Sequence, residues 1–471
     1  MVAVLALALV GVLTFTGKGE VFDHIAVLPF QVTSTDSTHE ALGFGMAEEV
    51  IARLVGVSTL NVPAIRSTMK YKGSTASYAE IARELGAKAL VDGSVQKIDN
   101  RIHVIVKLID PSTGRQLWSE PYDENAENIL DLQSRIAQAV VRAVQVKVTK
   151  DEQDHLARPQ KKVDPRAYEL YVTARDMSRS NPSRAIFDSI ITTLQRAIDI
   201  EPDNASYHAQ LAFMYSELVG YSHVKNSDVI EKMKVAAETA LKLDPDLAES
   251  QWAAGHVAYN QLRFGAALSY TARALELAPG NSGIFHFRGY VLMAVGRIDE
   301  ALVMFRRSYG VDPVAGRKLG YNVGMCYLFM RRYDDAITSL KQWLPQDPRS
   351  NMGHTFLAYA YSMKGMHKEA LAHNDSAVHW GKYNRPFILY RAGQHELASK
   401  AWKETLPFQS DHGKATWFGF LGQKDSAFSW LERFSQSPSG EILFIRHDPW
   451  LDNLRDDPRF KELMKKMNLL E

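Results

Sequence analysis

The first part of the chain alternates short apolar runs with amphipathic segments. Residues 25–30 form a brief apolar run between polar neighbours, which is typical of a buried strand. Residues 42–54 repeat apolar side chains at helical spacing, and residues 102–108 alternate between apolar and polar positions as a half-buried strand does. The same reasoning predicts strands at residues 60–62, 89–91 and 116–122 and helices at residues 78–85 and 129–144. This order of elements indicates a small α/β domain over residues 21–148.

The rest of the chain has a helical pattern that repeats itself. Pro245, Pro279, Pro313 and Pro348 stand 34, 34 and 35 residues apart. Small residues recur at this step in three positions of the repeat. The first position holds Gly255, Gly289 and Gly324, and the second holds Ala267, Ala301, Ala336 and Ala370. The third holds Ala240, Ala274 and Ala377, with Ser308 and the bulkier Trp343 between them. Small residues let two helices approach closely, and proline ends the second helix because it lacks an N–H. The step therefore predicts helix pairs stacked into a solenoid.

Three segments carry these phases together: AAGHVAYNQLRFGAALSYTARALELAP, FRGYVLMAVGRIDEALVMFRRSYGVDP and NVGMCYLFMRRYDDAITSLKQWLPQDP. They resemble tetratricopeptide repeats. With one earlier helix pair included, we expect such repeats over residues 167–380, after a charged linker at residues 149–166 that contains two prolines. Residues 381–471 are expected to be degenerate repeats and a cap, in which Trp450, Leu451, Leu454 and Phe460 would cover the last apolar face.

The α/β domain carries a second resemblance. The segments IAVLPF, GFGMAEEVIARL, YAEIARELGAKALVDGSVQKIDNRIHVIVKLIDPSTGRQLWSEPYD and ILDLQSRIAQAV resemble, in order, the TolB-amino-terminal-like domain, which is related to the FlgO-like domain. In that family the domain commonly lies between a membrane helix and tetratricopeptide repeats. The other side of the membrane often carries a winged-helix DNA-binding domain, a kinase or a nucleotide cyclase. This sequence contains none of those parts.

The amino-terminal run at residues 2–15 is apolar and uncharged, and the first charge is Lys18. As a helix it is short for a hydrocarbon core of about 30 Å. Three interpretations stay open: a membrane anchor at residues 1–16, the core of a cleaved signal peptide, and a buried helix. The anchor is favoured, since no basic residue precedes the run and no clear cleavage site follows it. It implies a membrane-anchored protein whose folded part lies in the periplasm.

Composition and motifs exclude several function classes. The formal net charge of +1 leaves no global basic footprint, so we expect no nucleic-acid partner. The single cysteine, Cys326, rules out an internal disulfide. Gly43, Gly45 and Glu48 make a defective dinucleotide fingerprint, because the third glycine position is a carboxylate; a structural turn is the expected role. We find no metal-ligand spacing and no catalytic set. The sequence therefore predicts neither enzymatic activity nor a cofactor.

The side chains most informative about function lie in the first helix of each repeat. They stand one residue after the position of the recurring glycine, or three residues before it. We name them the aromatic row: Phe213, Trp252, His256, His286, Tyr290, Tyr321, Met325 and Tyr359. First-helix positions of this kind often face the groove of a tetratricopeptide solenoid. The alternative is that these large side chains only pack helix against helix.

The favoured hypothesis is a non-enzymatic sensory or scaffold module of a bacterial signalling system, which binds a protein or peptide in the repeat groove. The alternative is the regulatory remnant of a longer membrane-bound kinase, nucleotide cyclase or transcription regulator. A third hypothesis is that the α/β domain binds a small molecule.

Overall fold

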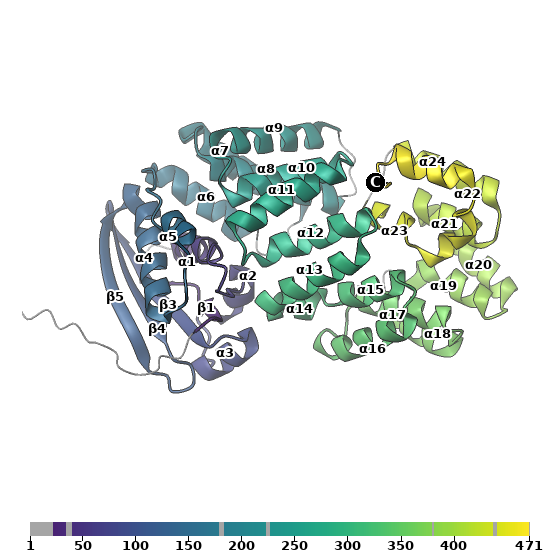
Figure 1. Ribbon diagram of the computed structural model, residues 1–471, viewed down its shortest axis with the longest axis horizontal. Coiled ribbons are helices and arrows are strands. Elements are labelled where there is room, and N and C mark those ends of the chain that lie inside the picture. The colour runs from purple at the N-terminus through teal and green to yellow at the C-terminus, as the bar shows by residue number, and fades with distance from the viewer. Residues whose placement is uncertain are drawn as a thin grey trace, which may run out of the picture.

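The computed structural model describes residues 22–33, 40–178, 183–222, 227–378, 381–436 and 440–470. A small sheet flanked by helices leads into a long array of paired helices (Figure 1). This confirms the expected fold class, a small α/β part followed by an all-α solenoid.

The sheet consists of β1 (Ile25–Val27), β2 (Gln31–Val32), β3 (Ala89–Ile98), β4 (Arg101–Ile109) and β5 (Gln116–Asn125). Its order is β1-β3-β4-β5, and β2 also pairs with β3. The strands β1 and β2 run parallel to β3, whereas β3, β4 and β5 are antiparallel. The prediction of a strand at residues 60–62 is wrong, because that segment forms only an isolated bridge between Asn61 and His24.

Five helices accompany the sheet: α1 (Glu40–Leu54), α2 (Ile65–Thr68), α3 (Tyr78–Leu85), α4 (Ile129–Val144) and α5 (Lys150–Leu156). Alternate residues of β1 point to opposite faces, as the period of a strand requires. Ile25 and Val27 join a core with α1 and α4, while Ala26 packs with Ile81 and Leu85 of α3. The sheet is therefore covered by α1 and α4 on one side and by α3 on part of the other.

The segment at residues 149–166, expected to be a linker, contains a helix and buried side chains. Thr149 and Glu152 form a capping box that starts α5, and the Glu152 carboxylate also accepts the backbone N–H of Ser58 at 2.8 Å. Leu156 and Val163 are buried in the core of the α/β part. An exposed linker holds few contacts, whereas this segment packs Leu156 and Val163 into the core.

The helical array begins directly against the α/β part. Its first helix, α6 (Pro165–Met177), buries Tyr168 and Val172 against α1. A Cβ atom at Gly45 would lie 2.3 Å from Val172 Cγ1, so this glycine permits the close approach of α1 and α6. Gly45, singled out as part of a weak nucleotide motif, thus has a packing role.

The following helices are α7 (Arg184–Ile200), α8 (Ala205–Ser222), α9 (Ser227–Leu243), α10 (Ala248–Asn260), α11 (Phe264–Leu277), α12 (Ser282–Ala294) and α13 (Ile298–Val311). After them come α14 (Pro313–Leu319), α15 (Tyr321–Phe329), α16 (Tyr333–Trp343), α17 (Asn351–Met363), α18 (His367–Ser376), α19 (Gly381–Arg391), α20 (His395–Thr405), α21 (Asp411–Phe420) and α22 (Lys424–Gln436). Helices that are adjacent in the sequence pack in pairs, of which α6 with α7 is the first and α21 with α22 the last. The alanines of the second-helix phase, Ala267, Ala301, Ala336 and Ala370, are fully buried. The pairs at the predicted step make this array tetratricopeptide-like.

One repeat departs from the pattern. Its first helix is divided into α14 and α15 at Gly320. Trp343 lies against this break, and it stands in a phase that small residues fill in most other repeats. A Cβ atom at Gly320 would lie only 2.2 Å from the indole Cδ1, so no side chain fits between them.

The last part of the chain, with α23 (Ile442–Ile445) and α24 (Pro458–Lys466), returns to the middle of the array. Figure 1 shows α23 close to α12. The Arg446 guanidinium donates to the carbonyl oxygen of Val295 at 2.6 Å, and Arg331 donates to that of His447 at 2.5 Å. The predicted cap therefore contacts both the last helix pairs and helices more than a hundred residues earlier.

The prediction of a membrane-anchored, periplasmic protein requires correction. Within the described ranges, no helix combines the length and the apolar character needed to cross a membrane. The run at residues 2–15, from which the prediction came, lies outside those ranges.

Candidate functional site

The aromatic row lies on five first helices, α8, α10, α12, α15 and α17. The row is not uniformly accessible. Phe213, Trp252, His286, Tyr290 and Tyr321 are half-buried. His256, Met325 and Tyr359 are buried, with 9%, 2% and 7% of their surface exposed. The structure thus divides the row into five partly buried side chains and three buried ones.

The first end of the row is a cluster of rings. Phe213 and Trp252 have ring centroids 5.2 Å apart, and His256 stacks on Phe287 at 3.7 Å. The Ser216 hydroxyl and His256 Nδ1 are hydrogen-bonded at 2.9 Å. Burial lowers the pKa of His256 to about 3, so the imidazole is neutral at pH 7 and behaves as a flat packing group.

The middle of the row rests on a buried amide. Asn322 is fully buried, and its Nδ2 lies 3.0 Å from His286 Nε2 and 3.3 Å from the Tyr290 hydroxyl. Burial lowers the pKa of His286 to about 4, so this ring is also neutral at pH 7. The amide fixes the orientation of both rings, since a buried polar group keeps the partners that satisfy it. Sequence reasoning missed Asn322, although an amide among the apolar residues of a short helix is a visible signal.

The other end of the row is covered by the returning segment. The rings of Tyr359 and Trp450 are parallel, with centroids 4.5 Å apart. The Tyr359 hydroxyl donates to the buried carboxylate of Asp448 and accepts the Trp450 N–H at 3.1 Å. Tyr359 is therefore satisfied within the chain, and the groove expected there is filled by the carboxy-terminal segment.

A group of charged residues, here called the charged seam, lies between α1 and the first helices of the array. The sequence did not predict it. The seam contains Glu48, Glu49, Arg53, Arg66, Arg175, Glu217 and Glu249. Arg175 pairs with Glu48 at 2.8 Å and with Glu49 at 2.7 Å. Burial raises the pKa values of Glu48, Glu217 and Glu249, because it penalises the charged carboxylate. The seam sits where the α/β part meets α6, α8 and α10, so it connects the two parts of the chain.

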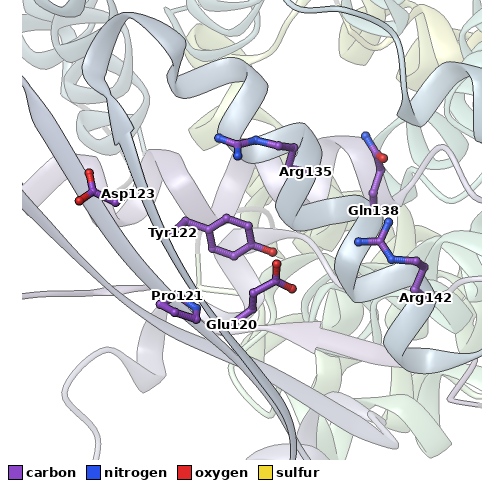
Figure 2. A pocket seen from close by; sticks show the side chains of 7 residues that line it. All are labelled: Glu120, Pro121, Tyr122, Asp123, Arg135, Gln138 and Arg142. Atoms are coloured by element: carbon purple, nitrogen blue, oxygen red, sulfur yellow. The ribbon is translucent and has the colours of Figure 1, made fainter. Parts of the chain in front are cut away.

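A shallow pocket of about 300 Å³ lies between β5 and α4 (Figure 2). Its lining consists of Glu120, Pro121, Tyr122, Asp123, Arg135, Gln138 and Arg142. Arg135 is paired with Glu124 at 2.7 Å, and burial together with Glu120 raises the pKa of Tyr122 to about 12. The pocket is polar and open, and its walls mix both charge signs. Among the described residues, no group of three or more His, Cys, Asp or Glu side chains could hold a metal ion.

No family model matches the chain. The TolB-like assignment of the α/β part accordingly stays a resemblance of sequence.

One curated protein resembles part of this chain. It is named "Putative adenylate cyclase 3", from Rhizobium meliloti (strain 1021), and is 35% identical over 190 residues. The match covers 40% of this chain and 32% of that protein. The chain thus spans about a third of the length of the curated relative that it matches.

Solved structures with similar folds include repeat proteins. YrrB, described as a TPR protein with an unusual peptide-binding site, is 20% identical, with a TM-score of 0.32, and covers 45% of this chain and 97% of its own. PilF of Pseudomonas aeruginosa is 16% identical, with a TM-score of 0.36, and covers 43% and 91%. A monomeric IFIT1 mutant with Gppp-AAAA is 12% identical, with a TM-score of 0.44, and covers 73% and 82%. Because these scores are low, the repeat assignment rests on the helix pairs themselves.

Proposed function

We propose that the chain is a non-enzymatic interaction module that binds a protein or peptide against four members of the aromatic row. The observation that supports this proposal is that Trp252, His286, Tyr290 and Tyr321 come from successive first helices and are each only partly buried. Rigid aromatic side chains give large contact areas at a low entropy cost, and they dominate the energies of many interfaces.

The supported part of the row is held in place before any partner arrives. Asn322 orients His286 and Tyr290, and Tyr321 packs edge-on against Trp343 with centroids 6.0 Å apart. Rings that are already ordered lose little freedom on binding, which favours affinity. His256, Met325 and Tyr359 are not part of the proposed site, because the chain itself buries them.

The test compares two tyrosines of the same helix. Tyr321 belongs to the row, whereas Tyr327 is also half-buried but lies between Arg306 and Arg332, with the Arg332 guanidinium 4.8 Å from its ring. A partner is first isolated with the full chain, and its affinity is then measured for Tyr321→Ala, Trp252→Ala and Tyr327→Ala. We expect losses of about 1–3 kcal/mol for the first two and no loss for Tyr327→Ala.

Unfolding curves of the same variants supply the control. If Tyr321→Ala and Tyr327→Ala lose similar stability and neither loses affinity, the row serves packing only and the proposal fails. A steep dependence of binding on salt would instead indicate a partner site dominated by charge.

A second candidate function is the regulatory part of a longer signalling enzyme, in particular a nucleotide cyclase. The similarity to "Putative adenylate cyclase 3" favours it. The test is the genomic sequence around the coding region: an in-frame cyclase, kinase or winged-helix sequence would support this function. If the flanking frame encodes none of these, the candidate loses its basis and the interaction module stands alone.

A further inference from the structure

The short helix α14 stands between the aromatic row and the α/β part. It is the first piece of a first helix that is divided at Gly320, where the Trp343 ring leaves no space for a side chain. Among the described hairpins, only this one has its first helix split in this way. The piece that results is seven residues long, and it contacts α3 of the α/β part.

On the inner side, α14 is held by two aromatic side chains. Trp343 Nε1 donates to the carbonyl oxygen of Gly316 at 3.0 Å, and the Tyr309 hydroxyl donates to that of Leu319 at 2.6 Å. Both side chains also reach the row. Trp343 packs against Tyr321, and the Tyr309 hydroxyl accepts from Asn322 Nδ2 at 3.0 Å. Asn322 in turn contacts His286 and Tyr290, so every attachment on this side leads to a proposed binding residue.

On the outer side, α14 contacts the α/β part through Val314, which packs against the cluster of Ile81 and Leu85, and through polar groups. Asp312 caps the helix by accepting the Ala315 N–H at 3.0 Å. Its carboxylate, only 1% exposed, also accepts from the Ser67 hydroxyl at 2.7 and 2.8 Å and from the Ala64 N–H at 3.1 Å. Arg317 donates to the Glu84 carboxylate at 2.9 Å and to the Glu84 carbonyl oxygen at 3.2 Å.

We propose that α14 is a coupling element, which ties the position of α3 and of the segment around Ser67 to the state of the aromatic row. The inference rests on the proposed function, because the signal it transmits is a partner seated against His286, Tyr290 and Tyr321. A partner that shifts Tyr321 or Asn322 shifts Trp343 and Tyr309. Both hold the backbone of α14 directly, so the contacts of Asp312 and Arg317 change in turn.

The physical reason lies in the buried carboxylate of Asp312, which joins α14 to the α/β part. A buried carboxylate that loses its donors is costly, so Asp312 keeps either all of its contacts with the α/β part or none. Such a contact has two arrangements, as a coupling element requires. The apolar contact of α1 with α6 stays in place in both states, since Tyr168 and Val172 are buried there.

The first experiment needs no partner and perturbs the outer side. Ser67→Ala removes the hydroxyl that faces Asp312 and leaves α14 itself unchanged. Amide hydrogen exchange of the full chain is expected to rise about tenfold in residues 313–324 and also in residues 286–290. The matched control is Ser250→Ala, a buried serine whose hydroxyl donates to Ala240 within the array. It should leave residues 313–324 unchanged.

The reverse experiment perturbs the inner side. Tyr309→Phe removes the hydroxyl shared by Leu319 and Asn322, and we expect about tenfold faster exchange around residues 64–68 and 84–88. Tyr259→Phe serves as the control, because that hydroxyl makes no hydrogen bond among the described residues. If each change stays confined to its own side of α14, the coupling is refuted. That result would leave the affinity test of the aromatic row untouched, so the two proposals fail separately.

Discussion

Gly320 and Trp343 form the residue pair on which the irregular repeat depends. A side chain at position 320 has no space, since its Cβ would lie 2.2 Å from the Trp343 ring. We expect Gly320→Ala to lower the free energy of unfolding by about 1–3 kcal/mol, as overpacking does. Trp343→Ala should cost about 3–5 kcal/mol through the cavity it leaves.

Combined in one chain, the two changes should cost less than the sum of their separate effects, because the methyl group then occupies vacated space. Urea unfolding of the four proteins measures this coupling. Strict additivity would show that the Trp343 ring is not what excludes a side chain at position 320.

At the residue scale, the buried imidazole of His256 makes the stability of the chain depend on pH. Its pKa is about 6.5 in an unfolded chain and about 3 when folded, because burial penalises the imidazolium. Between these values the unfolded chain binds the proton and the folded chain does not, so stability falls as the pH falls. The slope is about 1.4 kcal/mol per pH unit for one such group.

The variant His256→Gln isolates this contribution, because the seam carboxylates, whose raised pKa values act in the opposite direction, are common to both proteins. Denaturant unfolding between pH 4.5 and 6.5 should show a shallower acid loss for the variant, by about one proton. Equal slopes would mean that His256 is not buried as a neutral ring.

At the scale of the element, β5 is the open edge of the sheet. The Ala126 N–H donates to the Asn100 carbonyl oxygen, and the register then turns the N–H groups of odd-numbered β5 residues outward. Pro121 occupies one of these positions and has no N–H, and Glu124 accepts the N–H of Asn125. Such gaps discourage pairing between sheet edges.

We therefore expect Pro121→Thr to promote self-association, which sedimentation over a range of concentrations would detect. Ser119→Thr is the control. The backbone N–H of residue 119 already points outward from the same strand, so this substitution adds no donor to the edge. If neither variant self-associates more than the parent chain, Pro121 does not protect the edge.

The division of the chain at residues 149–166 stays a prediction, but α6 suggests a different boundary for stability. Tyr168 and Val172 fill the space above Gly45, and a fragment that ends at residue 148 lacks both. We expect this fragment to melt without a cooperative transition and a fragment that ends at residue 202 to regain one. Near-ultraviolet circular dichroism on heating distinguishes them, and a cooperative melt of the shorter fragment would restore the predicted boundary.

At the scale of the whole molecule, features that depend on neighbouring helices could be predicted from the sequence, whereas features that depend on distant contacts could not. The repeat could be predicted because Ala267 and its equivalents are small for a local reason, the closeness of two neighbouring helices. The division at Gly320 could not, since the ring that lies against it belongs to a tryptophan more than twenty residues later in the sequence. Nor could the cover over Tyr359, since Trp450 was expected to close only the last helix pair. Single-sequence patterns carry no record of such long-range contacts.

The most direct test of the account is hydroxyl-radical footprinting of the full chain, alone and saturated with its isolated partner. Oxidation of each aromatic side chain reports how far solvent reaches it. We predict that the partner protects Trp252, His286, Tyr290 and Tyr321, while Tyr327 and the 68% exposed Phe408 stay reactive. Tyr359, already covered by Trp450, should stay unreactive in both states. Protection confined to Phe408 or to the open edge of β5, with the row unchanged, would contradict the proposed binding surface.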